Sequence, residues 1–504
     1  MAKLLRCATQ PLSKQKLLAE LGLSNANLNY KCHIVPLLEQ GLIAMKLPDA
    51  PKAACNATSS RPGAGAAGCN EFQGAPPYDA TKFPAFIKPL STAEHGLTMT
   101  LFSPPTQTTL HYRIVTPMFL GGENQQADAT QFRNASFKGA LRFWWRALNW
   151  GQAFKDAGQQ PTAALQLLHQ REGDLFGLAS DGKNSRQSRV QIHSELQGAE
   201  RKLPVTAPTP KKSDKPLEEV SYLLGQGLFD HKSGVTRQYL EGGNLTIRLN
   251  FKLGMSEADI QSVEQAAIAL GLFGGLGSRA RKGLGSLALH QLERPGQPVR
   301  EFATVESIED FIQALDFSAP ADAPLSAFTQ ATRIDMSATA GKPLDALTAI
   351  GNELQLYRGY GRKNPRTNQH EVNGQKALKI FDDDHHNVLD ATKGGHLQQL
   401  PKRAVFGLPH NYFFSSIEKN FGITTEDEGR RASPLLVHIH PLKDGKFVAI
   451  QTLLPGVFLP DGMKVEAKGK SKYAIPESKA DYAVITRYLD GFANKKPLKA
   501  PHHG

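Results

Sequence analysis

The sequence has few cysteines and no long apolar run. Its four cysteines all lie in the first 69 of 504 residues, without a Cys-x-x-Cys pair: Cys7, Cys32, Cys55 and Cys69. This spacing suits neither a zinc site nor a disulfide framework spread along the chain. No apolar stretch approaches the roughly 18–20 residues that span a bilayer, and the N-terminus lacks a signal-peptide apolar segment. We therefore expect a cytoplasmic protein without membrane contact.

Acidic residues are outnumbered by basic ones. The chain has 59 Lys and Arg against 47 Asp and Glu, which gives a formal net charge of +12. Such an excess favours a polyanionic partner, and without a membrane signal that partner is a nucleic acid. The content of hydrophobic residues, 40%, is typical of globular proteins, and the length implies about three domains.

The first hundred residues differ in composition from the rest. Residues 1–50 have the order helix (13–21), helix (25–40), strand (42–47), which is typical of a winged-helix-like module. Such a module could contact DNA or only other proteins. Residues 51–105 are rich in Ala, Gly and Pro, and this composition predicts a linker.

The remaining chain alternates predicted strands and helices. We expect strands at 109–115, 244–251, 284–292, 435–440 and 447–453, and helices at 136–150, 257–273, 344–358 and 477–494. This mixture predicts an α+β fold with two units, residues 106–295 and 326–495, each a small antiparallel sheet with helices on one face. A break is expected near 293–324, where Pro and acidic residues cluster. The polar stretch 208–216 is expected to be an exposed loop.

One predicted helix carries two separate stripes. In "FRNASFKGALRFWWRALNW" at 132–150, apolar residues recur at helical spacing: Phe137, Leu141, Trp144 and Leu148. Three cations recur every four residues on another side: Lys138, Arg142 and Arg146. No acid occurs between Ala129 and Lys155. The cations could bind a phosphodiester backbone or form an ordinary solvated face. The tryptophans Trp144 and Trp145 are more typical of core anchors than of base-stacking platforms.

A second stretch is rich in glycine and positive charge. "GLFGGLGSRARKGLGSL" at 271–287 contains six glycines and three cations, Arg279, Arg281 and Lys282, and no acid occurs between Gln265 and Leu292. A flexible loop of this kind can place backbone amides and charges round a phosphate. It is not a Walker loop, because no Gly-Lys-Ser/Thr triplet is present. Its partial dinucleotide fingerprint follows a helix instead of opening one, so that interpretation fails.

Five segments in this order resemble one protein family. "TPMFLGG" at 116–122, "SFKGALRFWWRAL" at 136–148, "GGLGSRARKGLGSL" at 274–287 and the pair "PKRAVFGLPHNYFF" at 401–414 with "RRASPLLVHIH" at 430–440 are similar to the RAMP superfamily. Within it they resemble the first-numbered subunit of the type III-B CRISPR (Cmr) effector complex. The resemblance covers about residues 108–494.

The resemblance implies a fold, partners and contact residues. It implies two ferredoxin-like, RRM-like RAMP domains. It also implies an antiviral RNA-binding subunit that holds the guide crRNA near its 3′ end together with target RNA, beside other RAMP subunits, and that performs no chemistry. The RNA contacts expected on this basis are Arg133, Lys138, Arg142, Arg146, Gly275, Gly277, Ser278, Arg279, Arg281 and Lys282. The winged-helix-like start departs from the family pattern, and a DNA contact through residues 1–50 stays open.

Few residues suggest catalysis, and no cofactor or metal is expected. "FDDDHHN" at 381–387 holds Asp382 to His386, but five adjacent side chains cannot all reach one ion, so an exposed polar loop is expected. His438 and His440 alternate along a strand, as packed or solvent-facing histidines do. His410 could contact RNA, shape a turn or act as a general base. Two alternatives therefore remain: a metal-independent guide-processing ribonuclease and a winged-helix DNA-binding regulator.

Overall fold

The computed structural model describes most of the chain after residue 105. The described residues are 106–121, 126–129, 132–179, 185–204, 215–414, 416–469 and 471–501. The expected winged-helix-like module (1–50), the expected linker (51–105) and most of the loop expected at 208–216 lie outside these ranges.

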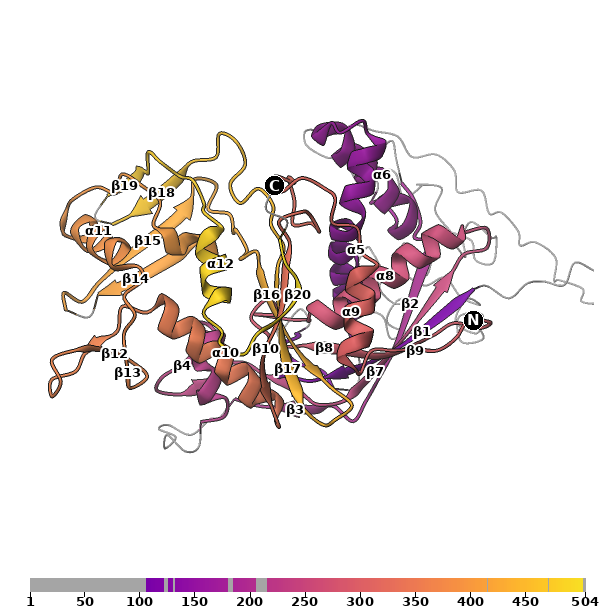
Figure 1. Cartoon of the computed structure of the whole chain (residues 1–504), viewed down its shortest axis with the longest axis horizontal. Helices are drawn as coiled ribbons and strands as arrows, with labels where there is room; N and C mark the ends of the chain where they lie inside the picture. Colours follow the sequence, from indigo (N-terminus) through magenta and orange to yellow (C-terminus); the bar gives the residue numbers. More distant parts are fainter. Residues whose placement is uncertain are drawn as a thin grey trace, which may run out of the picture. The chain divides into compact units, whose positions relative to one another are not determined.

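The first half is a sheet covered on one face by helices (Figure 1). Its strands are all antiparallel to their neighbours, in the order β2 (Val190–Gln197), β7 (Asn244–Phe251), β1 (Gln107–Ile114), β8 (Leu287–Glu293) and β9 (Arg300–Glu301). Its helices are α5 (Asn134–Asp156), α6 (Pro161–Phe176) and α8 (Glu257–Phe273). Along the chain the main elements follow as β1-α5-α6-β2-β7-α8-β8. Buried and more exposed residues alternate along β1 and β7, so one face of the sheet supplies the core.

Helix α5 is longer than the sequence predicted because its apolar side continues. Phe137, Leu141 and Trp144 are buried as expected, and Trp150 and Ala153 extend the buried side through a further turn. Helix α8 begins where Ser256 caps it by accepting a hydrogen bond from the Asp259 backbone N–H at 3.1 Å. It ends at Gly274, where the glycine-rich loop begins.

The second half repeats this order. Its antiparallel sheet runs β16 (Leu435–Pro441), β17 (Phe447–Leu453), β10 (Arg333–Ala340) and β20 (Lys496–Lys499), with helices α10 (Pro343–Arg358) and α12 (Ala483–Asp490). The chain order β10-α10-β16-β17-α12-β20 places the strands in the same relative positions as in the first half. The expected helix at 477–494 is shorter than predicted, because α12 begins only at Ala483.

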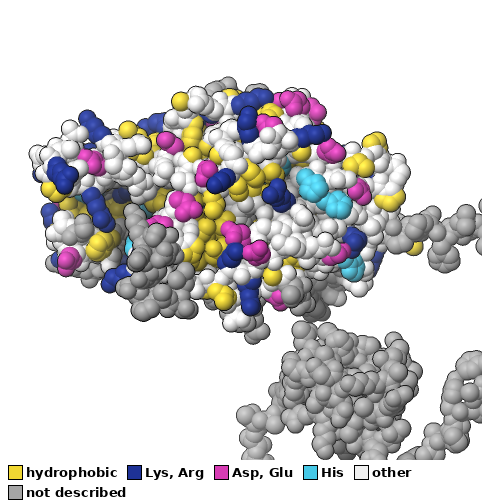
Figure 2. All heavy atoms as spheres, turned by 90° about the horizontal axis from the view of Figure 1, so that it is seen from below, with side chains coloured by type: hydrophobic (Ala, Val, Ile, Leu, Met, Phe, Trp, Pro, Cys, Tyr) yellow, Lys and Arg dark blue, Asp and Glu magenta, His cyan; other side chains and the backbone are white. Residues whose placement is uncertain are grey.

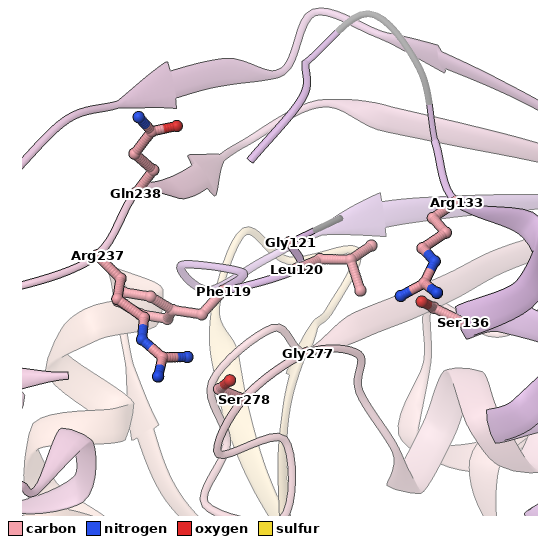
Figure 3. A pocket seen from close by; sticks show the side chains of 9 residues that line it. All are labelled: Phe119, Leu120, Gly121, Arg133, Ser136, Arg237, Gln238, Gly277 and Ser278. Atoms are coloured by element: carbon pink, nitrogen blue, oxygen red, sulfur yellow. The ribbon is translucent and has the colours of Figure 1, made fainter. Parts of the chain in front are cut away.

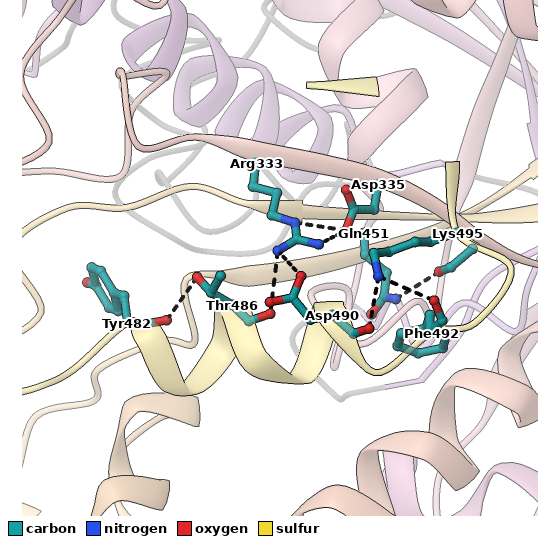
Figure 4. Close-up of polar contacts among 9 residues, drawn as sticks. Arg333, Asp335, Gln451, Tyr482, Thr486, Asp490, Phe492 and Lys495 are labelled. Carbon is teal, nitrogen blue, oxygen red and sulfur yellow. Dashed lines mark hydrogen bonds and ion pairs between the residues drawn. The ribbon is translucent and has the colours of Figure 1, made fainter. Parts of the chain in front are cut away.

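A buried ion pair fixes α12 against the second sheet (Figure 4). Arg333, on β10, donates from Nε to Asp335 at 2.9 Å and from Nη1 to Asp490 of α12 at 2.8 Å. Asp335 is buried, and its pKa is raised by that burial, which the adjacent guanidinium partly opposes. The pair therefore links the ends of two elements that are distant in sequence.

An inserted unit interrupts the second half and was not predicted. It contains the sheet β14 (His410–Phe414), β15 (Lys419–Thr425), β18 (Val465–Lys468), β19 (Lys472–Ala474), with α11 (Asp382–Lys393), the 3-10 helix η3 (Lys402–Phe406) and the small sheet β11 (Arg362–Lys363), β12 (His370–Val372), β13 (Gln375–Lys376). It has its own apolar core, which includes Val388, Phe421 and Ile423.

The exposed loop predicted at 381–387 is wrong. This segment begins helix α11, whose first turn carries three aspartates that complement the positive end of the helix dipole. Asp384 is buried and accepts hydrogen bonds from the backbone N–H groups of Lys402 (3.0 Å) and Arg403 (2.9 Å).

The break expected near 293–324 contains ordered structure. Helix α9 (Val305–Gln313) starts with a capping box between Thr304 and Ser307. Its apolar side places Ile308 and Phe311 in the same core as the first sheet and α5. Pro and acidic residues in this segment are exposed or partly exposed round a packed helix, which is why composition alone suggested a break.

The remaining short elements lie between β2 and β7 in the sequence. They are β3 (Glu200–Lys202), η2 (Glu218–Val220), α7 (Ser221–Leu224), β4 (Phe229–Asp230), β5 (Gly234–Val235) and β6 (Tyr239–Glu241). The mixed α+β class predicted from the sequence is confirmed. Among the described residues, no helix combines the length and apolar character that a bilayer crossing requires.

Candidate RNA-binding surface

The start of α5 and the glycine-rich loop meet at one cavity of about 380 Å³ (Figure 3). Arg133 and Ser136 of α5 lie on one side of it, and Arg237 and Gln238 lie on the other. Gly277 and Ser278 of the loop lie between them, beside the segment Phe119, Leu120, Gly121. Residues from three regions of the sequence, 119–136, 237–238 and 277–278, therefore share one surface. Of the ten expected contacts it brings together Arg133, Gly277 and Ser278.

The glycine-rich loop is held by backbone hydrogen bonds and close backbone approach. The Ser278 N–H donates to the Phe119 carbonyl at 3.0 Å, and the Gly285 N–H donates to the Pro117 carbonyl at 2.8 Å. Gly277 has φ +92°, and a Cβ there would lie 2.7 Å from the Phe119 oxygen. The loop expected to be flexible is thus fixed against residues 116–121, because its glycines permit that approach.

The charge that the described residues bring to this cavity is of one sign. None of the nine described residues that line it is acidic, and two are arginines. The first turn of α5 contains no acid and no side-chain cap, so its backbone N–H groups and the helix dipole add positive potential at the same end. The side-chain oxygen of Gln238 is buried and has no hydrogen-bond partner within the described part of the chain. The arrangement can bind an anionic group.

Arg237 was missed by the sequence analysis. It lies between β5 and β6, outside any periodic pattern, and reaches the cavity because β6 packs beside the segment 116–121: the Met118 and Leu240 backbones exchange hydrogen bonds of 2.8 and 2.9 Å. The sequence contained no signal for this pairing.

Arg142 and Arg146 have a counter-charge that the sequence did not reveal. Arg142 Nε donates to Glu172 Oε1 at 2.7 Å, and Arg146 Nη1 donates to the same oxygen at 2.5 Å. The Glu172 side chain is only 4% exposed, whereas the two arginines keep about a third of their surface. These cations of the stripe therefore stabilise a buried carboxylate of α6, and they are not a free ladder.

Lys138 is the remaining cation of that stripe. It is partly buried, and its pKa is lowered first by burial and then by the nearby Arg142. Trp144 and Trp145 are core residues, 2% and 3% exposed, as expected, and the Trp145 indole donates to the Ser262 hydroxyl at 3.0 Å.

Arg281 joins the two halves of the molecule. Its guanidinium lies over the Phe143 ring, 5.1 Å from the centroid, and donates to the Ser433 carbonyl at 2.6 Å. Its own carbonyl accepts from the Val437 N–H of β16 at 3.0 Å. Burial lowers its pKa. These contacts give Arg281 a packing role, with little of its charge left for a ligand.

Arg279 and Lys282 follow Ser278 along the loop. Arg279 is exposed, adopts φ +64°, and donates to the carbonyls of Leu224 (2.9 Å) and Gln226 (3.0 Å). Gly275 pairs with Ser286 and closes the base of the loop. Burial, then Arg358, then Arg279 lower the pKa of Lys282 to about 7.

His438 and His440 are buried and hydrogen-bonded. His438 Nδ1 donates to the Gly274 carbonyl, and His440 Nε2 donates to the Phe302 carbonyl, each at 2.6 Å. Burial lowers their pKa values to about 3 and about 4, so both rings are neutral near pH 7. Within the described ranges, no group of three or more His, Cys, Asp or Glu is arranged to hold a metal ion.

On the face that Figure 2 shows, Lys and Arg side chains do not form a large positive patch. They lie scattered among Asp and Glu side chains. The cavity of Figure 3 differs from that face, because its charged lining residues are all arginines.

Comparison with known proteins finds a family match over part of the chain. Residues 111–288, which include the end of β1, α5, α8 and the glycine-rich loop, match the RAMP superfamily. Over this stretch the chain is similar to RAMP-superfamily proteins. The resemblance inferred from the sequence motifs is therefore confirmed.

Named relatives are components of Cmr complexes. Over 193 residues, which are 35% of this chain and 92% of the relative, the sequence is 26% identical to the CRISPR system Cmr subunit Cmr1-2 of Pyrococcus furiosus. Among solved structures, Cmr1 from Pyrococcus furiosus (apo form) is 15% identical, with a TM-score of 0.42 over 79% of this chain and 99% of that chain. A chain of the type III-B Cmr-beta complex bound to cognate target RNA is 12% identical, also with a TM-score of 0.42, over 77% of this chain and 98% of that chain.

Proposed function

We propose that this chain is an RNA-binding RAMP subunit of a type III-B CRISPR effector complex. In this proposal it holds guide crRNA near its 3′ end, together with target RNA and neighbouring RAMP subunits, and it catalyses no reaction. The observation that carries the proposal is the acid-free cavity between α5 and the glycine-rich loop, inside the stretch that is similar to RAMP-superfamily proteins. The name of the relative, a Cmr subunit, agrees with this role.

The proposed contacts form one path along the loop. Arg133 and Arg237 would bind backbone phosphates from the two sides of the cavity, because each guanidinium can fork two phosphate oxygens. Ser278 and Gly277 would approach the chain between them, and Arg279 and Lys282 would continue the path. Binding through phosphates predicts little sequence preference and a steep dependence on salt.

We propose further that each half is a ferredoxin-like domain, residues 106–295 and 326–495. Each contains four antiparallel strands and two helices in the chain order strand-helix-strand-strand-helix-strand, with the same relative strand order, as RNA-recognition motifs do. The first half adds α6 and β9 to this set. The inserted unit, whose segments lie between α10 and β16 and between β17 and α12, would then be an insertion into the second domain.

The absence of catalysis has a direct test. Purified protein incubated with end-labelled repeat RNA and with single-stranded target RNA, once in EDTA and once in Mg²⁺, is expected to leave both RNAs intact while it retards them in a native gel. Cleavage in EDTA that a His410→Ala variant abolishes would establish the metal-independent ribonuclease instead. Tighter binding to duplex DNA than to RNA, lost on deletion of residues 1–105, would establish the DNA-binding regulator.

A further inference from the structure

A group of three cations and one histidine lies where the glycine-rich loop meets the second half. Its four members come from four segments and are called the seam cluster: Lys282 (loop), Arg358 (end of α10), Arg403 (η3) and His410 (β14). Arg403 Nη1 donates to the Arg358 carbonyl at 3.0 Å. Burial lowers the pKa of His410 well below its usual value, and the nearby charges of Arg358, Arg403 and Lys282 lower it further.

Aromatic rings hold the guanidinium groups in place. Arg358 lies over the Phe406 ring, 4.8 Å from its centroid, and Arg403 lies over the Tyr412 ring at 4.6 Å. The His410 ring contacts the same tyrosine, with 4.7 Å between centroids. Stacking fixes the planes of the guanidinium groups without using their N–H donors, so these donors remain available to a ligand.

Several buried polar atoms in and beside the seam cluster have no hydrogen-bond partner among the described residues. The Nε atoms of Arg358 and Arg403 are buried and have no hydrogen-bond partner within the described ranges, and the same holds for the Tyr412 hydroxyl. Native proteins rarely leave buried donors unpaired, so several at one place indicate a missing partner that accepts hydrogen bonds.

The cluster also lacks compensating negative charge. Asp384 is the carboxylate beside it, 3.9 Å from Arg403 Nε, and it already accepts two backbone hydrogen bonds. No described residue forms an ion pair with Lys282 or Arg358, and Arg279, on the same loop, adds a further cation with Arg430 beside it. Three permanent or potential cations with one carboxylate leave an excess of positive charge that an anion would balance.

We propose that the seam cluster is a binding site for one phosphate group of a bound RNA chain, and we call this site the seat. The assignment of the phosphate to RNA rests on the proposed function. The binding site itself is inferred from the unpaired donors and the uncompensated charge. The seat lies three to four residues along the loop from Ser278 and Arg279, so an RNA backbone leaving the cavity of Figure 3 would reach it next. A phosphate here would contact both halves of the molecule at once.

The state of Lys282 gives the seat a measurable signature. Its pKa of about 7 is set by burial and by the neighbouring Arg358 and Arg279, and a phosphate would raise that pKa by favouring the ammonium form. Binding at pH 7.5 should therefore take up protons, about half a proton per RNA bound. Calorimetric titration with a single-stranded RNA in two buffers of different ionisation enthalpy measures this uptake.

Substitutions of Lys282 test whether the seat contributes to RNA binding and to proton uptake. Lys282→Arg, which stays charged, is expected to bind RNA within about threefold of the wild type but without proton uptake, and Lys282→Met is expected to bind roughly tenfold more weakly. Lys446→Met, at an exposed lysine that pairs with Asp444, is the matched control and should change neither quantity. Thermal melts of each variant check that the fold is retained.

The outcomes also distinguish this inference from the proposed function. If Lys282→Met binds RNA as tightly as the wild type and no protons are taken up, the seat is wrong, whatever Arg133 and Arg237 do. If the protein binds no RNA but inorganic pyrophosphate raises its melting temperature, and Lys282→Met removes that rise, the seat stands and the proposed function falls.

Discussion

The double variant Arg133→Ala/Arg237→Ala is expected to bind single-stranded RNA about a hundredfold more weakly than the wild type. Both guanidinium groups line the acid-free cavity, and each charge-assisted contact to a phosphate is worth about a factor of ten or more. The plot of log Kd against log salt should also become shallower by about 1.4, because each phosphate contact on a single strand releases about 0.7 counterion. Fluorescence anisotropy over a range of salt concentrations measures both quantities.

A matched variant removes the other two arginines of α5. In Arg142→Gln/Arg146→Gln/Glu172→Gln, two cations and their shared carboxylate are lost together, so no buried charge is left unpaired. This triple variant should keep a salt slope within about 0.5 of the wild type. If it loses the slope while Arg133→Ala/Arg237→Ala keeps it, the RNA follows the cationic stripe of α5 and not the cavity.

The second large effect concerns stability in acid. The folded-state pKa values of His438 and His440 lie well below that of an unfolded histidine, near 6.5, chiefly because both rings are buried. Between about pH 6.5 and pH 4 the unfolded chain therefore binds more protons than the folded one, and the free energy of unfolding falls as the pH falls. The two rings together should account for a loss of about 4 kcal/mol between pH 7 and pH 4.5.

A conservative double variant isolates that contribution. His438→Asn/His440→Gln keeps an amide donor near each carbonyl acceptor, the Gly274 and Phe302 oxygens, but removes the titration. Urea unfolding at pH 7 and pH 4.5 should show that the variant loses about 4 kcal/mol less than the wild type over this interval. The nearby His290, itself depressed in pKa, stays in both proteins and cancels. Equal losses in the two proteins would show that the rings are not buried as described.

The sequence predicted best the elements whose local signals agree. The expected bounds of α8 and β17 match the structure at both ends, because Ser256 caps α8, Gly274 ends it, and β17 is a continuous buried run. The core role of the α5 tryptophans followed from the same helical spacing. These predictions needed no knowledge of distant residues.

Long-range contacts explain the failures. The sequence has no acidic residue between Ala129 and Lys155. Glu172, however, lies on the next helix, α6, and tertiary packing brings it to Arg142 and Arg146. Arg237 entered the cavity by the pairing of β6 with residues 116–121, which no local pattern indicates. Helix α11 could have been recognised, because three aspartates at the start of a segment that ends with Lys393 and Gly394 complement a helix dipole.

Photo-crosslinking tests the central claim most directly. Single-stranded RNA carrying 4-thiouridine, crosslinked to the protein and digested, should yield RNA-modified peptides from three segments: the start of α5 round Arg133, the segment round Arg237, and the loop 277–282. Crosslinks confined to other surfaces, such as β2 or α6, or none at a concentration that saturates binding, would contradict the account.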